Sequence, residues 1–209
     1  MLQVIDNWLP TTLVQSLQQL CDAHGALRQN QLENQLFSWR PDHGTPRSAH
    51  APEQQAVMEH YLSEFLRPLL TPWSPNATGV EWWCNTNNDL DWHIDKDEAE
   101  YRRSGQYALP LLSTVFYPHV SCAGGELLVA DNPPVKEGQT APPPRFRSVI
   151  SIPPVVNRLV VFPPESCTES THSKVSAIPL PSTSGRANPS PRRSQRHRLE
   201  LLHGHRPST

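Results

Sequence analysis

The apolar positions of this chain follow a helical period in its first third and a strand period afterwards. The first helical pattern has apolar side chains at i, i+4 and i+7, supplied by Leu13, Leu17 and Leu20. A second pattern begins at Pro52, a residue tolerated in the first turn of a helix, and is predicted to end at Pro68. Because both patterns are amphipathic, we expect two N-terminal helices that pack as scaffold against a sheet.

Strand patterns dominate from Gly79 onwards. Short β-rich runs separated by turn signals occur at 80–84, 92–95, 113–117, 126–130, 148–152 and 158–162, in addition to earlier runs at 4–5 and 36–39. Many short strands backed by helices are typical of a sandwich or a jelly roll. The predicted fold class is therefore mainly β with N-terminal helices.

Proline divides the chain into a globular part and a tail. The 209 residues suffice for one domain with its own core, and the 23 prolines concentrate after Asn132. Residues 132–147 form a proline-rich insert that is predicted to be extended, either as a passive surface loop or as a substrate lid. We expect a folded domain over residues 1–180 and a disordered, basic Pro/Ser/Arg-rich tail over residues 181–209.

Charge and cysteine usage restrict the class of protein further. The formal net charge of −2 argues against a general polyanion binder, and the basic tail has no aromatic residue after Arg186 on which a nucleic-acid base could stack. The four cysteines are widely spaced, which favours free thiols, and no stretch approaches the roughly eighteen apolar residues of a membrane span. With no signal-peptide pattern either, we expect a soluble, cytoplasmic protein without a membrane or nucleic-acid partner.

The candidate chemistry lies in the run Trp92-His93-Ile94-Asp95. Side chains two residues apart on a strand project to the same face, so His93 and Asp95 can hold adjacent positions around one metal ion. A later histidine would complete the two-histidine, one-carboxylate set of non-haem Fe(II) oxygenases. We favour His172, since it follows the predicted strand 158–162; the alternatives, which lie too close to the motif or in the tail, are His119, His203 and His205.

An ordered series of motifs resembles the 2-oxoglutarate- and Fe(II)-dependent dioxygenases of the prolyl-4-hydroxylase-like branch. From about Gly79 to Arg186 the chain contains an aromatic strand, Trp-His-x-Asp-Lys-Asp-Glu, Ser-Thr-Val-Phe-Tyr, Gly-Gly-Glu-Leu and Asn-Arg-Leu-Val-Val-Phe, followed by a histidine. The resemblance implies a double-stranded β-helix, or jelly-roll, core. It also implies hydroxylation of an unidentified substrate with release of succinate and CO2.

The resemblance assigns roles to particular residues. His93, Asp95 and His172 would bind Fe(II). Arg186, with Lys174 as second choice, would bind the far carboxylate of 2-oxoglutarate, because a guanidinium can donate two parallel hydrogen bonds. The aromatic residues that would line the cosubstrate pocket are Trp83 and either Phe116 or Tyr117. Ascorbate is a further cofactor that the resemblance allows.

The end of the chain departs from the family. After Arg186 the sequence Ala-Asn-Pro-Ser-Pro-Arg-Arg has none of the alternation of a central strand, so the expected jelly roll could lack its last strand. This departure leaves a second function open, that of a catalytically inactive jelly-roll relative acting as a binding or scaffold module. The substrate could be a small molecule or a peptide, and the sequence specifies neither it nor the oligomeric state.

Overall fold

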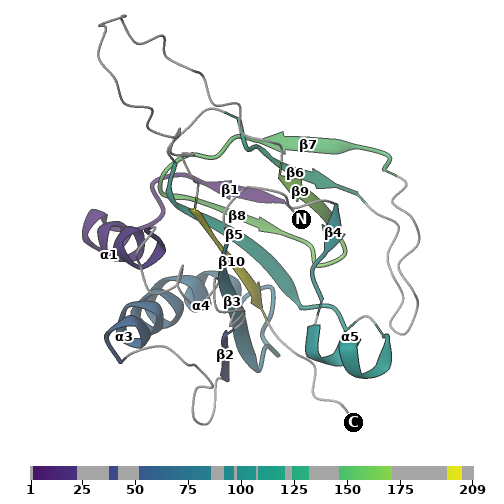
Figure 1. Cartoon of the computed structure of the whole chain (residues 1–209), viewed down its shortest axis with the longest axis horizontal. Coiled ribbons are helices and arrows are strands. Elements are labelled where there is room, and N and C mark those ends of the chain that lie inside the picture. The colour runs from purple at the N-terminus through teal and green to yellow at the C-terminus, as the bar shows by residue number, and fades with distance from the viewer. Residues whose placement is uncertain are drawn as a thin grey trace, which may run out of the picture.

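The computed structural model describes residues 2–22, 38–41, 52–85, 92–96, 98–106, 108–120, 124–131, 146–170 and 197–203 (Figure 1). These residues form two antiparallel sheets and a few helices, which confirms the expected mainly β class. The larger sheet has the strand order β1 (Gln3–Ile5), β8 (Arg158–Phe162), β5 (Leu112–His119), β10 (His197–His203), β3 (Gly79–Asn85) and β2 (Ser38–Pro41). The smaller sheet has the order β4 (His93–Ile94), β9 (Cys167–Ser170), β6 (Leu127–Ala130) and β7 (Val149–Ile152).

The helical elements are α1 (Thr11–Cys21), α3 (Pro52–His60), the π-helical turn η1 (Tyr61–Leu66), α4 (Arg67–Leu70) and α5 (Glu98–Ser104). In Figure 1, α1, α3 and α4 lie on the side of the larger sheet that faces away from β6 and β7. Over the described ranges, none of these helices has the length and apolar character that crossing a membrane requires.

Strand β5 separates two apolar layers. Leu112 and Phe116 pack on one side with residues of the helices, among them Leu17 of α1. Val115 and Tyr117 pack on the other side with residues of β6 and β7. This division follows from the two-residue period of strand side chains. The helices therefore cover one face of the larger sheet and the smaller sheet covers the other.

The second helical segment runs past Pro68, where the sequence predicted its end. In η1 the N–H of Arg67 donates to the carbonyl of Leu62, five residues back, which is the π-helical pattern. This wider turn accommodates the missing N–H and the ring of Pro68, which lies in the first turn of α4. The prediction of a helix end at Pro68 is therefore wrong, and the helical segment ends at Leu70.

Strand β10 corrects one expectation about the end of the chain. It lies between β3 and β5 and pairs antiparallel with both, so the larger sheet has a strand at the place where the sequence predicted that one could be missing. Residues 197–203 of the predicted tail form this strand. The apolar run at 199–202 is short and follows residues whose Pro/Ser/Arg composition is typical of disorder. The sequence pattern therefore did not predict a strand there. The other domain limits, including the insert 132–147, stay predictions.

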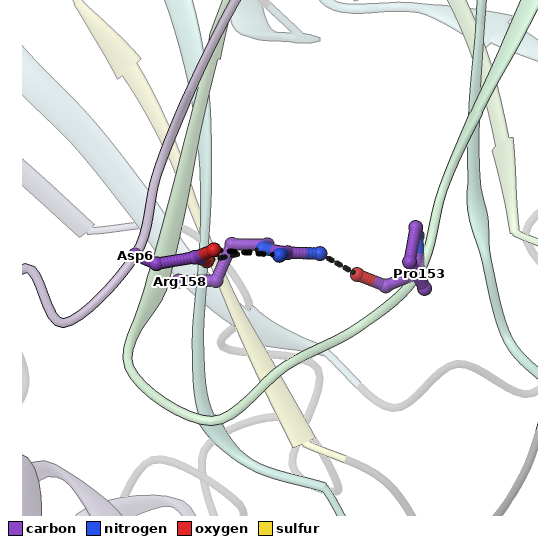
Figure 2. A network of polar contacts seen from close by, with 3 residues as sticks. All are labelled: Asp6, Pro153 and Arg158. Atoms are coloured by element: carbon purple, nitrogen blue, oxygen red, sulfur yellow. Dashed lines mark hydrogen bonds and ion pairs between the residues drawn. The ribbon is translucent and has the colours of Figure 1, made fainter.

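The segment that leads into α1 is fixed to the connection between β7 and β8 (Figure 2). Arg158 donates from Nε and Nη2 to the carboxylate of Asp6 at 2.6 and 2.8 Å, and from Nη1 to the carbonyl of Pro153 at 2.7 Å. Beside this pair, the Asn157 side chain both accepts from and donates to the backbone of Leu9, at 2.8 Å each way. These contacts join residues that are far apart in the sequence.

Candidate metal centre

His93 and Asp95 lie at the edge of the smaller sheet, where His93 begins the short strand β4 and Asp95 directly follows it. His93 is in register with Thr168 of β9, and Thr168 is in register with Val129 of β6. Val129 is buried between the two sheets. Because residues in register share one face of a sheet, His93 projects toward the larger sheet.

The two candidate ligands converge. His93 Nε2 lies 3.7 Å from Asp95 Oδ1, and the two side chains are 31% and 10% exposed, so the imidazole can be approached while the carboxylate is largely covered. The hydroxyl of buried Thr168 lies 3.3 Å from the same nitrogen. One imidazole nitrogen thus faces two oxygen atoms on the inner side of the sheet. Imidazole and carboxylate are ligands that suit Fe(II).

This donor pair fits a single divalent cation after a small rearrangement. Nitrogen and oxygen ligands lie about 2.1 Å from such an ion, so two ligands in adjacent octahedral positions are about 3 Å apart. The observed separation of 3.7 Å between His93 Nε2 and Asp95 Oδ1 is wider, so the two side chains would have to move closer together to bind one ion.

The third predicted metal ligand, His172, lies outside the described residues. So do Arg186 and Lys174, the residues predicted to bind 2-oxoglutarate. Within the described ranges, no three or more side chains of His, Cys, Asp or Glu gather in a set that could hold a metal ion. The three-ligand set of His93, Asp95 and His172, and the role of Arg186, therefore stay predictions.

The aromatic candidates are separated by the strand period. Tyr117 is 1% exposed and packs between the sheets, on the side toward which His93 projects. Phe116 packs on the helical side, where its ring centroid lies 5.7 Å from that of Tyr61. Of these two, Tyr117 is the one on the side of the candidate metal site. Trp83 lies in β3 opposite Glu200 of β10, and its side chain is outside the described part.

Pattern reasoning missed Thr168, which lies opposite His93 on the neighbouring strand. The run Cys167–Ser170 consists of small and polar residues without an apolar alternation, so it gives no strand signal. It forms a strand because it has neighbours on both sides, β4 and β6. Only this pairing shows that a residue on β9 reaches the imidazole.

Comparison with known proteins gives a likeness of fold. The sequence matches no family model and no curated protein. Solved structures with a similar fold include a prolyl-4-hydroxylase from Pseudomonas putida, with a TM-score of 0.55 and 16% identity over 98% of this chain and 92% of that one. AviO1 from Streptomyces viridochromogenes has a TM-score of 0.51 and 11% identity over 100% of this chain and 91% of that one. HygX from Streptomyces hygroscopicus, solved with nickel and 2-oxoglutarate bound, has a TM-score of 0.50 and 11% identity over 97% of this chain and 81% of that one.

At these identities the likeness shows the fold alone, one that this chain shares with a prolyl-4-hydroxylase and with HygX. The activity of this chain has to be argued from its own residues.

Proposed function

We propose that this chain is an Fe(II)- and 2-oxoglutarate-dependent dioxygenase that hydroxylates a small-molecule or peptidyl substrate and releases succinate and CO2. The observation that carries the proposal is the convergence of His93 Nε2 and Asp95 Oδ1 on the inner side of the smaller sheet. The likeness of fold to the prolyl-4-hydroxylase supports it from a separate direction.

The strand order supports a double-stranded β-helix built from β3 to β10. Without β1 and β2, the larger sheet reads β8-β5-β10-β3 and the smaller reads β4-β9-β6-β7. From β3 to β10 the chain visits the larger and smaller sheets in the order large, small, large, small, small, large, small, large. Such repeated crossing between two antiparallel sheets is the winding of a jelly roll. In this fold the space between the sheets, with Tyr117 on its wall, would hold the cosubstrate.

The third ligand sets a geometric condition. His172 lies two residues after Ser170, the last residue of β9. A straight continuation of the strand would put His172 four residues beyond Thr168, about 13 Å along the strand from the position opposite His93. Two residues span at most about 7 Å, so a reversal of the chain after Ser170 is needed to return His172 to the site. The proposal therefore requires that reversal.

The far carboxylate of 2-oxoglutarate needs a cationic partner, and two arginines are candidates. Arg186 is the residue that the motif series indicates. Arg198 is a second candidate, because it lies near the start of β10 in the centre of the larger sheet, in register with Asn85 of β3. Either guanidinium could donate two hydrogen bonds to a carboxylate. Replacing each by Met and measuring the concentration of 2-oxoglutarate needed for half-maximal succinate release separates the two.

When bound, Fe(II) together with 2-oxoglutarate would supply the oxidising chemistry. His93 and Asp95 would hold the metal and leave other coordination positions open. The apolar side chains between the sheets, which include Val115, Val129 and Phe162, would exclude water from the reacting groups.

The test is an anaerobic Fe(II) titration in the presence of 2-oxoglutarate, followed by measurement of succinate after oxygen is admitted. We expect iron-dependent succinate from the wild type and none above background from His93→Ala. His60→Ala is the matched control, since His60 packs edge-on against Phe65 in the helical layer. Wild-type succinate release no greater than that of His93→Ala would refute the enzyme proposal.

The register of β9 favours a second function, that of an inactive relative that binds without catalysis. The position opposite His93 holds a hydroxyl, Thr168 Oγ1, which is a weak ligand for Fe(II) compared with imidazole. If the chain does not reverse after Ser170, the site has two strong ligands and the weak Thr168 hydroxyl, and would hold iron less firmly than a three-ligand site with a second imidazole. His172→Ala distinguishes the two functions: it abolishes Fe(II) binding in the enzyme and leaves binding unchanged in the inactive relative.

A further inference from the structure

A small apolar cluster lies behind the strand that carries the candidate ligands. Ile94 and Ala130 are 7% and 1% exposed, and the side chains of Trp92, Leu109 and Phe146 pack against them. We call these five residues the outer-face cluster. Ile94 and Ala130 alternate with His93 and Val129, which face the larger sheet, so the cluster covers the opposite face of the smaller sheet.

Within the outer-face cluster, two aromatic rings are in contact. The ring centroids of Trp92 and Phe146 lie 4.2 Å apart with an angle of 39° between the ring planes. Trp92 directly precedes His93 in the sequence. Any change in the position of the Trp92 ring therefore acts on the backbone from which the imidazole projects.

The position of Phe146 is fixed by its neighbours. Asp131, which directly follows β6, accepts hydrogen bonds at its carboxylate from the N–H groups of Arg147 and Ser148 at 2.9 and 2.6 Å. The N–H of Asp131 in turn donates to the carbonyl of Ser148 at 3.2 Å. The hydrogen bond from Ser148 is also the main reason that the pKa of Asp131 is lowered. Phe146 is thereby tied to the end of β6, independently of β4.

Strand β4 needs such support. It is two residues long, lies at the edge of its sheet and has two registered pairs, both with β9. Two registered pairs contribute little to the stability of a strand. The position of β4 therefore depends mainly on the side chains packed on its faces. On the outer face of β4, that packing is the outer-face cluster.

We infer that Phe146 is a positioning residue for the metal centre: by packing on Trp92 it fixes the orientation in which His93 and Asp95 face a divalent cation. This inference rests on the proposed function. It gives a role to Phe146, which lies near the end of the predicted proline-rich insert 132–147.

The test is a titration with Co(II) alone, followed through the visible absorption bands of the bound ion, on the full chain. We expect Phe146→Leu, which keeps apolar volume but removes the ring, to weaken Co(II) binding by about tenfold and to shift the absorption bands, as changes behind metal ligands do. Phe146→Tyr, which keeps the ring, should restore binding to within about twofold of the wild type. The double variant Trp92→Leu/Phe146→Leu should bind Co(II) no more weakly than the weaker-binding of the two single variants, since both substitutions act through one contact.

Leu70→Ala is the stability control. Leu70 is fully buried in the helical layer and is not part of the outer-face cluster. This variant should lower the melting temperature and leave Co(II) affinity unchanged at a temperature at which all variants are folded. Phe146→Leu with wild-type affinity and bands would overturn the inference while the proposed function stands. Wild-type binding no tighter than that of His93→Ala would refute the proposed function and this inference with it.

Discussion

Asn157 connects the beginning of the chain to strand β8 through both its backbone and its side chain. Its φ of 63° is left-handed, its N–H donates to the carbonyl of Tyr117, and its carbonyl accepts from the N–H of Trp8. The side-chain amide pairs with the backbone of Leu9 in both directions. Asparagine combines tolerance of the left-handed region with one donor and one acceptor, so both properties of the residue are used.

We expect graded destabilisation when Asn157 is replaced. Asn157→Gly keeps the backbone conformation but loses two hydrogen bonds, and should lower the free energy of unfolding by roughly 2 kcal/mol. Asn157→Ala should lower it by roughly 1 kcal/mol more, because alanine is strained at a positive φ. Asn157→Asp keeps the acceptor but places a second acceptor oxygen against the Leu9 carbonyl, so it should also be less stable than the wild type. Urea unfolding measures the series, and an alanine variant as stable as the wild type would contradict the role given to the amide.

Asp6 should make stability depend on pH at the acidic end. Its pKa is lowered below its ordinary value, first by the hydrogen bond from Arg158. A carboxyl whose pKa is lower in the folded than in the unfolded state stabilises the fold above the unfolded pKa, and the stabilisation is lost as pH falls through the folded pKa. The melting temperature of Asp6→Asn should therefore fall less steeply than that of the wild type below about pH 4. Asp22→Asn, which makes the same change of charge at the end of α1, is the control.

Sequence reasoning went furthest where one residue's role depends on its near neighbours. The period of a strand predicted that His93 and Asp95 share a face, and their side chains do converge. The Asn157 contact could not be predicted, because its partner Leu9 is 148 positions away. No local pattern carries that information.

Strand β10 should be essential for the larger sheet. It lies between β3 and β5, so its removal would leave both of them with an unpaired edge. A chain ending at Arg196 should lose its cooperative thermal transition and aggregate, whereas a chain ending at His203, which keeps β10, should melt like the full chain. Circular dichroism and size-exclusion chromatography measure both outcomes. Equal melting curves for the two truncated chains would show that β10 does not hold the sheet together.

The elements show which rules of sequence reasoning are local and which depend on the fold. The helix over Thr11–Cys21 was predictable, because its buried residues include Leu13, Leu17 and Cys21 at helical spacing. The rule that a proline ends a helix failed at Pro68, since a π-helical turn precedes it. Strand β10 has pairing partners on both sides, and such partners can make a strand of a short run that composition alone would leave disordered.

At the scale of the molecule, the two sheets bring together parts of the chain that the sequence keeps apart. The candidate site takes His93 from the middle of the chain and Thr168 from a strand 75 positions later. The resemblance predicted that a later histidine would meet the motif. A later strand, β9, pairs with β4, and His172 itself lies outside the described residues. The register of that pairing was beyond prediction, since the run Cys167–Ser170 gives no alternation to define it.

Thr168 and His172 together decide between the enzyme and its inactive relative. The Thr168 hydroxyl lies 3.3 Å from His93 Nε2, so a metal ion that binds this nitrogen must displace that contact. Thr168→Val keeps the shape of the side chain and removes the hydroxyl. If His172 completes the site, Thr168→Val should bind Fe(II) as tightly as the wild type or up to about fivefold more tightly, because one competing hydrogen bond is lost. In the same arrangement, His172→Ala should abolish Fe(II) binding. If Thr168 is itself the third donor, Thr168→Val should lose the metal and His172→Ala should keep it. Anaerobic Fe(II) titration of the two variants gives opposite results for the two arrangements, and the second of them would remove the basis for catalysis by this chain.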